Sequence, residues 1–176
     1  AIAAASSVPI VLYNVPPRTG CDLSAETVAR LAQIDGIVGI KEACGDAHRV
    51  AEILASVAAA GKDDFFVVSG EDAQTLQMLE LGAVGAISVT ANVLPGKIAG
   101  FFNAWAAGDV ERAREIDRQL QPVHEILFIE SSPAPTKWAL HDLGRINAGI
   151  RLPLIPLSDE HRAEVRQRID LAGAAK

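Results

Sequence analysis

The stretch Gly36-Ile37-Val38-Gly39-Ile40-Lys41-Glu42-Ala43 organises the rest of the chain. Its apolar run is too short for a helix, which indicates a buried parallel strand that ends in a lysine. Lys41 is the only one of the five lysines that ends such a run. Burial at the carboxyl end of the strand disfavours the charged ammonium, and a neutral amine can attack a carbonyl carbon to form a Schiff base. The alternative interpretation is a lysine that only marks where the strand reaches solvent.

The composition narrows the classes of protein that the chain can belong to. Its 176 residues, 49% of them hydrophobic, suffice for one domain with a sizeable core. A net charge of −6 argues against a nucleic-acid-binding surface, which would show clustered Lys and Arg. No run approaches the roughly 18 apolar residues of a membrane span. Cys21 and Cys44 form neither a metal-ligand spacing nor a disulfide framework, so we expect no metal and a reducing, cytoplasmic setting.

Strand-like segments alternate with helical patterns in the first part of the chain. Strands are predicted at 8–14, 36–41, 65–68 and 85–89. Tyr13, Lys41 and Ser69 stand 28 residues apart, so the chain repeats a β-α unit. Such units form a parallel sheet because each crossover needs a helix. After the first strand, Pro16-Pro17 predicts a loop over 15–22 instead of a helix.

No glycine-rich phosphate-binding fingerprint follows any strand, which weakens a nucleotide-binding doubly wound fold. We therefore expect residues 1–108 to form the second half of a (β/α)8 barrel, with about four β-α units and its active groups at the carboxyl ends of the strands. The pattern becomes wholly helical from Asp109, so residues 109–176 are expected to form a three-helix appendage whose last helix is capped by Ser158.

Half a barrel has an unusual consequence for the sheet. Four β-α units leave two unpaired strand edges and an open apolar interior. We therefore expect that the sequence is truncated at its N-terminus or that another chain completes the barrel, and truncation is the favoured interpretation.

Five motifs occur in an order that resembles one family. They are Leu12-Tyr13-Asn14-Val15-Pro16-Pro17-Arg18-Thr19-Gly20, Gly39-Ile40-Lys41-Glu42-Ala43, Ser69-Gly70-Glu71-Asp72, Ile87-Ser88-Val89-Thr90-Ala91-Asn92-Val93 and Pro133-Ala134-Pro135-Thr136-Lys137-Trp138-Ala139-Leu140. Together they resemble the C-terminal portion of the 4-hydroxy-tetrahydrodipicolinate synthase (dihydrodipicolinate synthase) family, within the pyruvate-dependent class I aldolase superfamily. The resemblance covers essentially the whole chain.

The resemblance implies a role for five residues. Lys41 matches the lysine that forms the Schiff base with pyruvate, and Tyr13 matches the tyrosine that relays protons. Arg18 matches the arginine that holds the carboxylate of L-aspartate 4-semialdehyde, while Ile87, through its carbonyl, and Gly70 line the pyruvate pocket. The implied reaction condenses the two substrates in the diaminopimelate route to lysine and uses no cofactor and no metal. The family is commonly a homotetramer, so a homo-oligomer is expected.

Two other interpretations of the whole chain stay open at this point. One is a sister aldolase or dehydratase of the same superfamily, and the other is a non-catalytic fragment whose C-terminal helices mediate assembly. The remaining relay groups and the pyruvate carboxylate clamp of the family would precede Ala1, so the chain alone is not expected to be a competent enzyme. Glu42 is either a general acid, or it anchors a loop or meets a basic neighbour.

Overall fold

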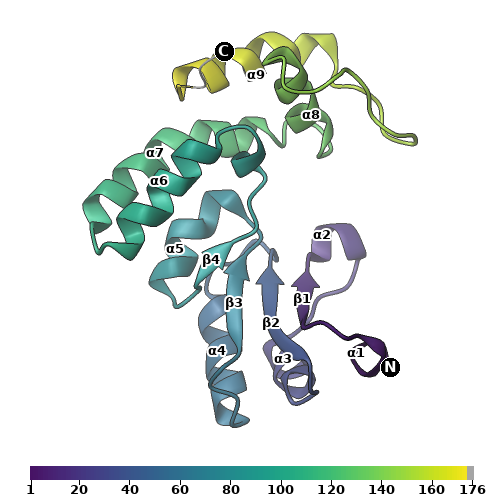
Figure 1. The fold of residues 1–176 in the computed structure, drawn as a ribbon, viewed down its shortest axis with the longest axis vertical. Helices are drawn as coiled ribbons and strands as arrows, with labels where there is room; N and C mark the ends of the chain where they lie inside the picture. The colour runs from purple at the N-terminus through teal and green to yellow at the C-terminus, as the bar shows by residue number, and fades with distance from the viewer. Residues whose placement is uncertain (174–176) are drawn as a thin grey trace. The chain divides into compact units, whose positions relative to one another are not determined.

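The computed structural model describes residues 1–173. The first half of the chain is built around a four-stranded parallel sheet. The chain forms two compact units, Ala1–Ile87 and Ser88–Lys176. In the first unit the strands follow one another in the order β1-β2-β3-β4 (Figure 1). They are β1 (Ile10–Asn14), β2 (Ile37–Glu42), β3 (Phe66–Ser69) and β4 (Gly85–Ala86). The predicted β-α repeat and parallel sheet are therefore confirmed.

The register of the sheet sorts its side chains onto two different faces. Asn14, Glu42 and Ser69 lie opposite one another across β1, β2 and β3, and all three are fully buried. Tyr13 directly precedes Asn14 and pairs with Lys41, which directly precedes Glu42. Because successive side chains of a strand alternate between faces, Tyr13 and Lys41 point to the other face. Tyr13 is 48% exposed, which identifies its face as the open one.

The helices of the first unit precede or follow its strands along the chain. They are α1 (Ile2–Ala5), α2 (Pro16–Thr19), α3 (Ala25–Ala32), α4 (Arg49–Ala59), the 3-10 helix η1 (Asp72–Gln74) and α5 (Thr75–Glu80). Helices α3, α4 and α5 contact β2, β3 and β4 respectively. Helix α3 begins as expected, because the Ser24 hydroxyl accepts a hydrogen bond from the Thr27 amide.

The loop predicted over 15–22 is wrong in part, because α2 occupies its first half. Pro16 and Pro17 are the first two residues of this helix. Amide groups in the first turn have no intrahelical acceptor, so a proline there costs no hydrogen bond, and its fixed φ suits a helix. The short helix ends at Gly20, whose φ of 68° is left-handed.

The regular elements of the second unit are all helices in the described residues. It contains the 3-10 helix η2 (Thr90–Asn92), α6 (Pro95–Ala106), α7 (Val110–Ile126), α8 (Ala134–Asp142) and α9 (Asp159–Leu171). Helix α7 contacts both α6 and α9, and α9 also contacts α8. The three helices expected after Asp109 are therefore present. The domain boundary at 108/109 stays a prediction, and the end of the range 109–176 lies outside the described residues.

Two local expectations are wrong. The fourth strand was expected to reach Val89 but ends at Ala86, because the chain turns into η2, where the Ala91 amide donates to the Ser88 hydroxyl. Ser158 precedes α9 as expected, but its side chain makes no capping bond. Its backbone amide donates instead to the Glu130 carboxylate at 3.0 Å. Within residues 1–173, no helix has the length and apolar character needed to cross a membrane.

Candidate active site

Lys41 and Tyr13 lie side by side at the carboxyl ends of neighbouring strands. Their backbones are register partners, and the Lys41 Nζ atom lies 4.3 Å from the centre of the Tyr13 ring. The lysine is half-buried, and the tyrosine stands on the open face of the sheet. A primary amine beside a phenol can provide a nucleophile and a group that both donates and accepts a proton. The structure therefore brings together the two residues that the sequence singled out for chemistry.

Gly70 directly follows β3 and packs against the aliphatic part of the Lys41 side chain. Its amide donates to the Glu42 carbonyl at 2.7 Å, which ties the segment after β3 to β2. A Cβ atom at this position would lie 2.8 Å from Lys41 Cε and 2.9 Å from Ala43 Cβ. Only a glycine leaves room for the lysine side chain here, because both distances are well inside van der Waals contact.

Ile87 and Arg18 lie at the ends of the two outer strands. Ile87 directly follows β4, and its amide donates to the Ser69 carbonyl at 2.9 Å. Its side chain is 53% exposed. Arg18 lies in α2, directly after β1, and its exposed side chain forms no ion pair with any residue of the described chain. The fold thus places all five expected residues at the carboxyl ends of the strands or in the segments that follow, and Tyr13 and Gly70 both lie against Lys41.

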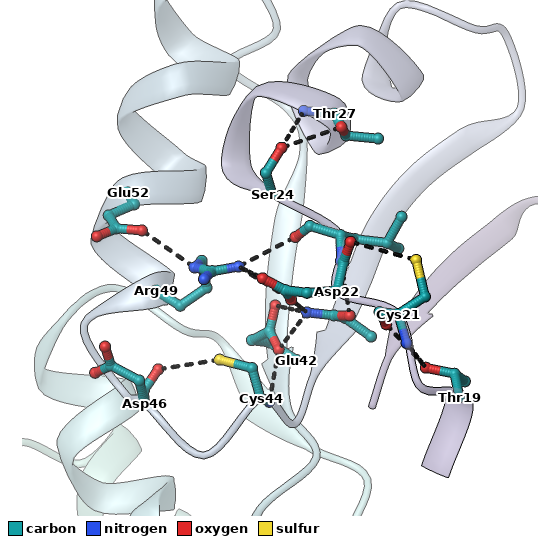
Figure 2. Close-up of polar contacts among 12 residues, drawn as sticks. Thr19, Cys21, Asp22, Ser24, Thr27, Glu42, Cys44, Asp46, Arg49 and Glu52 are labelled. Carbon is teal, nitrogen blue, oxygen red and sulfur yellow. Dashed lines mark hydrogen bonds and ion pairs between the residues drawn. The ribbon is translucent and has the colours of Figure 1, made fainter. Parts of the chain in front are cut away.

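A polar cluster, buried at Asn14 and Glu42 and more exposed at Asp22, lies behind Lys41 on the covered face. The Asn14 Nδ2 atom donates to Asp22 Oδ1 at 2.8 Å and to both Glu42 carboxylate oxygens, at 3.0 and 3.1 Å. The Cys44 amide donates to Glu42 Oε1 at 2.8 Å, and Arg49 binds the Asp22 carboxylate at 2.9 Å. Figure 2 shows Asp22, Glu42, Cys44 and Arg49 of this cluster, which come from the loop after α2, from the end of β2 and the residues just beyond it, and from α4. The bond to Cys44 supports the interpretation of Glu42 as a loop anchor.

The environment of this cluster shifts the pKa values of its acids in opposite directions. Burial raises the pKa of the Glu42 carboxyl, because the charged form loses its hydration. The hydrogen bond from Asn14 lowers the pKa of Asp22, and Arg49 adds to the effect. Burial also raises the pKa of the Cys44 thiol, which favours its protonated form.

Sequence reasoning missed Asn14, Asp22 and Arg49 as members of this cluster. The available signal was Asn14, a polar residue that directly follows Tyr13 as Glu42 follows Lys41. Because successive side chains of a strand point to opposite faces, both had to lie behind the candidate pair. Among residues 1–173, no group of three or more His, Cys, Asp or Glu side chains is arranged to hold a metal ion.

The sequence is similar to known proteins over nearly its whole length. Residues 1–172 match the model of the dihydrodipicolinate synthetase family. The chain is 47% identical over 173 residues to the 4-hydroxy-tetrahydrodipicolinate synthase of Alcanivorax borkumensis and 49% identical over 172 residues to that of Pseudomonas savastanoi pv. phaseolicola. Each alignment covers 98% of this chain and 58% of the relative, so the chain spans somewhat more than half the length of these proteins.

Solved structures show the same similarity in three dimensions. The dihydrodipicolinate synthase of Thermotoga maritima matches with a TM-score of 0.94 and 36% identity, over 99% of this chain and 59% of its own. The Acinetobacter baumannii enzyme, complexed with pyruvate, matches with a TM-score of 0.92 and 42% identity, over 99% and 58%. The four parallel strands therefore form part of a (β/α)8 barrel, as expected. The chain belongs to the dihydrodipicolinate synthetase family.

Proposed function

We propose that the whole protein is a 4-hydroxy-tetrahydrodipicolinate synthase, a Schiff-base-forming lyase of the class I aldolase type. It condenses pyruvate with L-aspartate 4-semialdehyde and releases water, in the diaminopimelate route to L-lysine. The observation that carries this proposal is the 4.3 Å approach of Lys41 Nζ to the Tyr13 ring, in a chain 47–49% identical to synthases of that name.

Lys41 supplies the nucleophile in the proposed reaction. Its amine adds to the keto carbon of pyruvate, and the resulting hydroxyl leaves as water after Tyr13 delivers a proton. The protonated imine withdraws electrons, so the pyruvate methyl loses a proton and becomes a nucleophilic enamine. This carbon attacks the aldehyde of the second substrate, and the amino group of that substrate then displaces Lys41 as the ring closes.

The other three residues hold the substrates. Arg18 offers a planar pair of donors that suits the carboxylate of L-aspartate 4-semialdehyde. The Ile87 carbonyl and Gly70 line the pyruvate subsite, and Gly70 is supported in this place by its close approach to Lys41. No step requires a metal or an organic cofactor.

Borohydride trapping tests the role of Lys41. The whole protein, incubated with pyruvate and borohydride, should gain one reduced pyruvyl group on Lys41, located by peptide mass spectrometry. Lys62→Ala is the matched control, because Lys62 lies beyond the end of α4 and should leave labelling intact. Equal labelling in Lys41→Ala would contradict the proposal.

Substitution of Arg18 separates the synthase from a sister aldolase. Arg18→Ala should raise the KM for L-aspartate 4-semialdehyde about 100-fold, because two charge-assisted hydrogen bonds are lost. The KM for pyruvate and the rate of trapping should change little. Arg30→Ala, an exposed arginine on α3, is the control. An unchanged KM for the aldehyde would favour a different second substrate.

We also propose a homo-oligomer, with a homotetramer as the expected state, in the cytoplasm. Light scattering on the whole protein measures the state directly. One structure with a TM-score of 0.93 to this chain is described as a monomeric dihydrodipicolinate synthase variant, so a monomer is the outcome that would correct the proposal.

A further inference from the structure

One side chain on the covered face of the sheet connects three segments behind the candidate site. Asn14 uses its amide nitrogen to bind Glu42 at the end of β2 and Asp22 beyond α2. Its amide oxygen accepts from the Leu23 amide at 3.1 Å. Both ends of the Asn14 amide are therefore engaged. A flip of the amide would set its oxygen against the carboxylate oxygens and its NH2 group against the Leu23 amide. The orientation of this side chain is fixed by its partners.

The bonds of Asn14 bear on each candidate catalytic residue. Asn14 follows Tyr13 and Glu42 follows Lys41, so the hydrogen bond between their side chains joins the two strands directly behind the pair. Its bonds to Asp22 and Leu23 also hold the end of the segment 15–21, which contains α2 and Arg18. Asp22 is held in turn by Arg49 of α4, and Glu42 by the Cys44 amide (Figure 2).

Asn14 is placed where small displacements are costly. The side chain is 1% exposed, as is that of Glu42, so water does not substitute for a lost partner. The rate of an enzymatic reaction depends strongly on the positions of its catalytic groups, since a displacement of about 1 Å can lower the rate about 100-fold. A change that leaves the fold intact but loosens this connection should therefore affect the reaction much more than the stability.

We propose that Asn14 is a positioning residue that, through Glu42 and Asp22, aligns Lys41, Tyr13 and the α2 segment that carries Arg18. This inference rests on the proposed function, because it concerns the same reaction. It assigns to Asn14 and Glu42 a paired role in the rate of Schiff-base formation, and to Asn14 and Asp22 a role in binding the aldehyde.

A swap of the two hydrogen-bonding groups tests the pair. Asn14→Asp removes the donor and sets a carboxylate against Glu42, while Glu42→Gln sets one amide nitrogen against the other. Each single variant of the whole protein should slow borohydride trapping of pyruvate about 100-fold. The double variant N14D/E42Q restores one donor facing one acceptor, so it should recover at least about tenfold of that rate. The KM for the aldehyde should rise in Asn14→Asp.

A destabilised control variant separates a positioning role of Asn14 from a general loss of stability. Ser24→Ala removes the cap of the neighbouring helix α3 and leaves Asn14 and its partners in place. It should trap pyruvate at the wild-type rate at temperatures where all variants are folded. If Asn14→Asp traps as fast as Ser24→Ala, or if the double variant recovers nothing, the inference is overturned.

The two proposals fail in different ways. If the wild-type protein traps no pyruvate at all, the proposed function fails. If the wild-type protein traps pyruvate and Asn14→Asp traps it at the same rate, only the positioning role is overturned. If Asn14→Asp does not fold, Asp22→Asn replaces it, because Asp22 is the more exposed partner. It should raise the KM for the aldehyde about tenfold, and an unchanged KM would overturn the inference.

Discussion

Lys41 is defined at the residue scale by what lies on each side of it. Tyr13 stands beside it on the open face, and Gly70 leaves room for its stem at the end of β3. An ammonium over an aromatic ring is attracted by about 0.5–1 kcal/mol at exposed sites, which favours the observed rotamer of the lysine. The position of the amine is therefore determined by two neighbours that are 28 or more residues away in the sequence.

Gly70→Ala should disturb the site through contact with Lys41. The added Cβ meets Lys41 Cε at 2.8 Å and Ala43 Cβ at 2.9 Å, so the lysine must move. We expect a loss of about 1–3 kcal/mol in unfolding free energy and much slower trapping of pyruvate. Gly96→Ala is the control, because nothing lies within 4 Å of its Cβ in α6. Wild-type trapping by Gly70→Ala would show that this contact does not position the lysine.

Glu42 should make stability depend on pH in a direction unusual for a carboxylate. Burial raises its pKa in the folded protein above the value of 4.5 in the unfolded chain, so the folded state holds a proton more tightly. The contribution is present below pH 4.5 and is lost as pH rises through the folded pKa. In urea unfolding between pH 4.5 and 8, the wild-type protein should lose stability relative to Glu42→Gln. A constant difference across this range would contradict the raised pKa.

The helices show at the element scale how far local sequence signals reach. Ser24 and Ser158 both precede helices and both suggested an N-cap. Only Ser24 caps, because its hydroxyl reaches the Thr27 amide, whereas Ser158 uses its backbone amide to bind Glu130. Pro16-Pro17 suggested a loop and instead begins α2. These signals indicate where a helix can begin. The tertiary partners decide which polar group near the helix start forms a hydrogen bond, and with which residue.

Alanine substitution separates the two serines. Ser24→Ala should lower the unfolding free energy by about 1 kcal/mol, the usual cost of losing a cap. Ser158→Ala should cost a few tenths of a kcal/mol at most, because no capping bond is lost. Thermal or urea unfolding of both variants, measured under identical conditions, decides this. Equal losses at the two positions would show that Ser158 caps in solution.

The parallel sheet has two unpaired edges and an exposed face in the described chain, and both bear on the whole molecule. In the described chain β1 and β4 pair on one side only, and the face that carries Lys41 exposes Val11 and Tyr13. Exposed strand edges and apolar faces are sites of association. The chain also spans 58% of the length of its relatives. A closed barrel would cover both the edges and this face.

Residues 1–176 expressed alone should therefore neither trap pyruvate nor turn over substrate. Light scattering should show association, because the open face of the sheet is apolar. Co-expression with the part of a related synthase that the alignment does not cover should restore trapping at Lys41. Turnover by the isolated chain would refute the requirement for a closed barrel.

The sequence alone predicted the β-α repeat, the parallel sheet and the placement of Lys41 and Tyr13 at strand ends, because apolar runs and their spacing are local properties of a chain. Arg18, Ile87 and Gly70 were assigned a role only by the resemblance to the family. Only the tertiary structure decided that Gly70 packs on Lys41 and that Asn14 connects Glu42 with Asp22. These contacts depend on strand register and on which face a side chain occupies. A single residue of register reverses the face, so such contacts exist only once the sheet has formed.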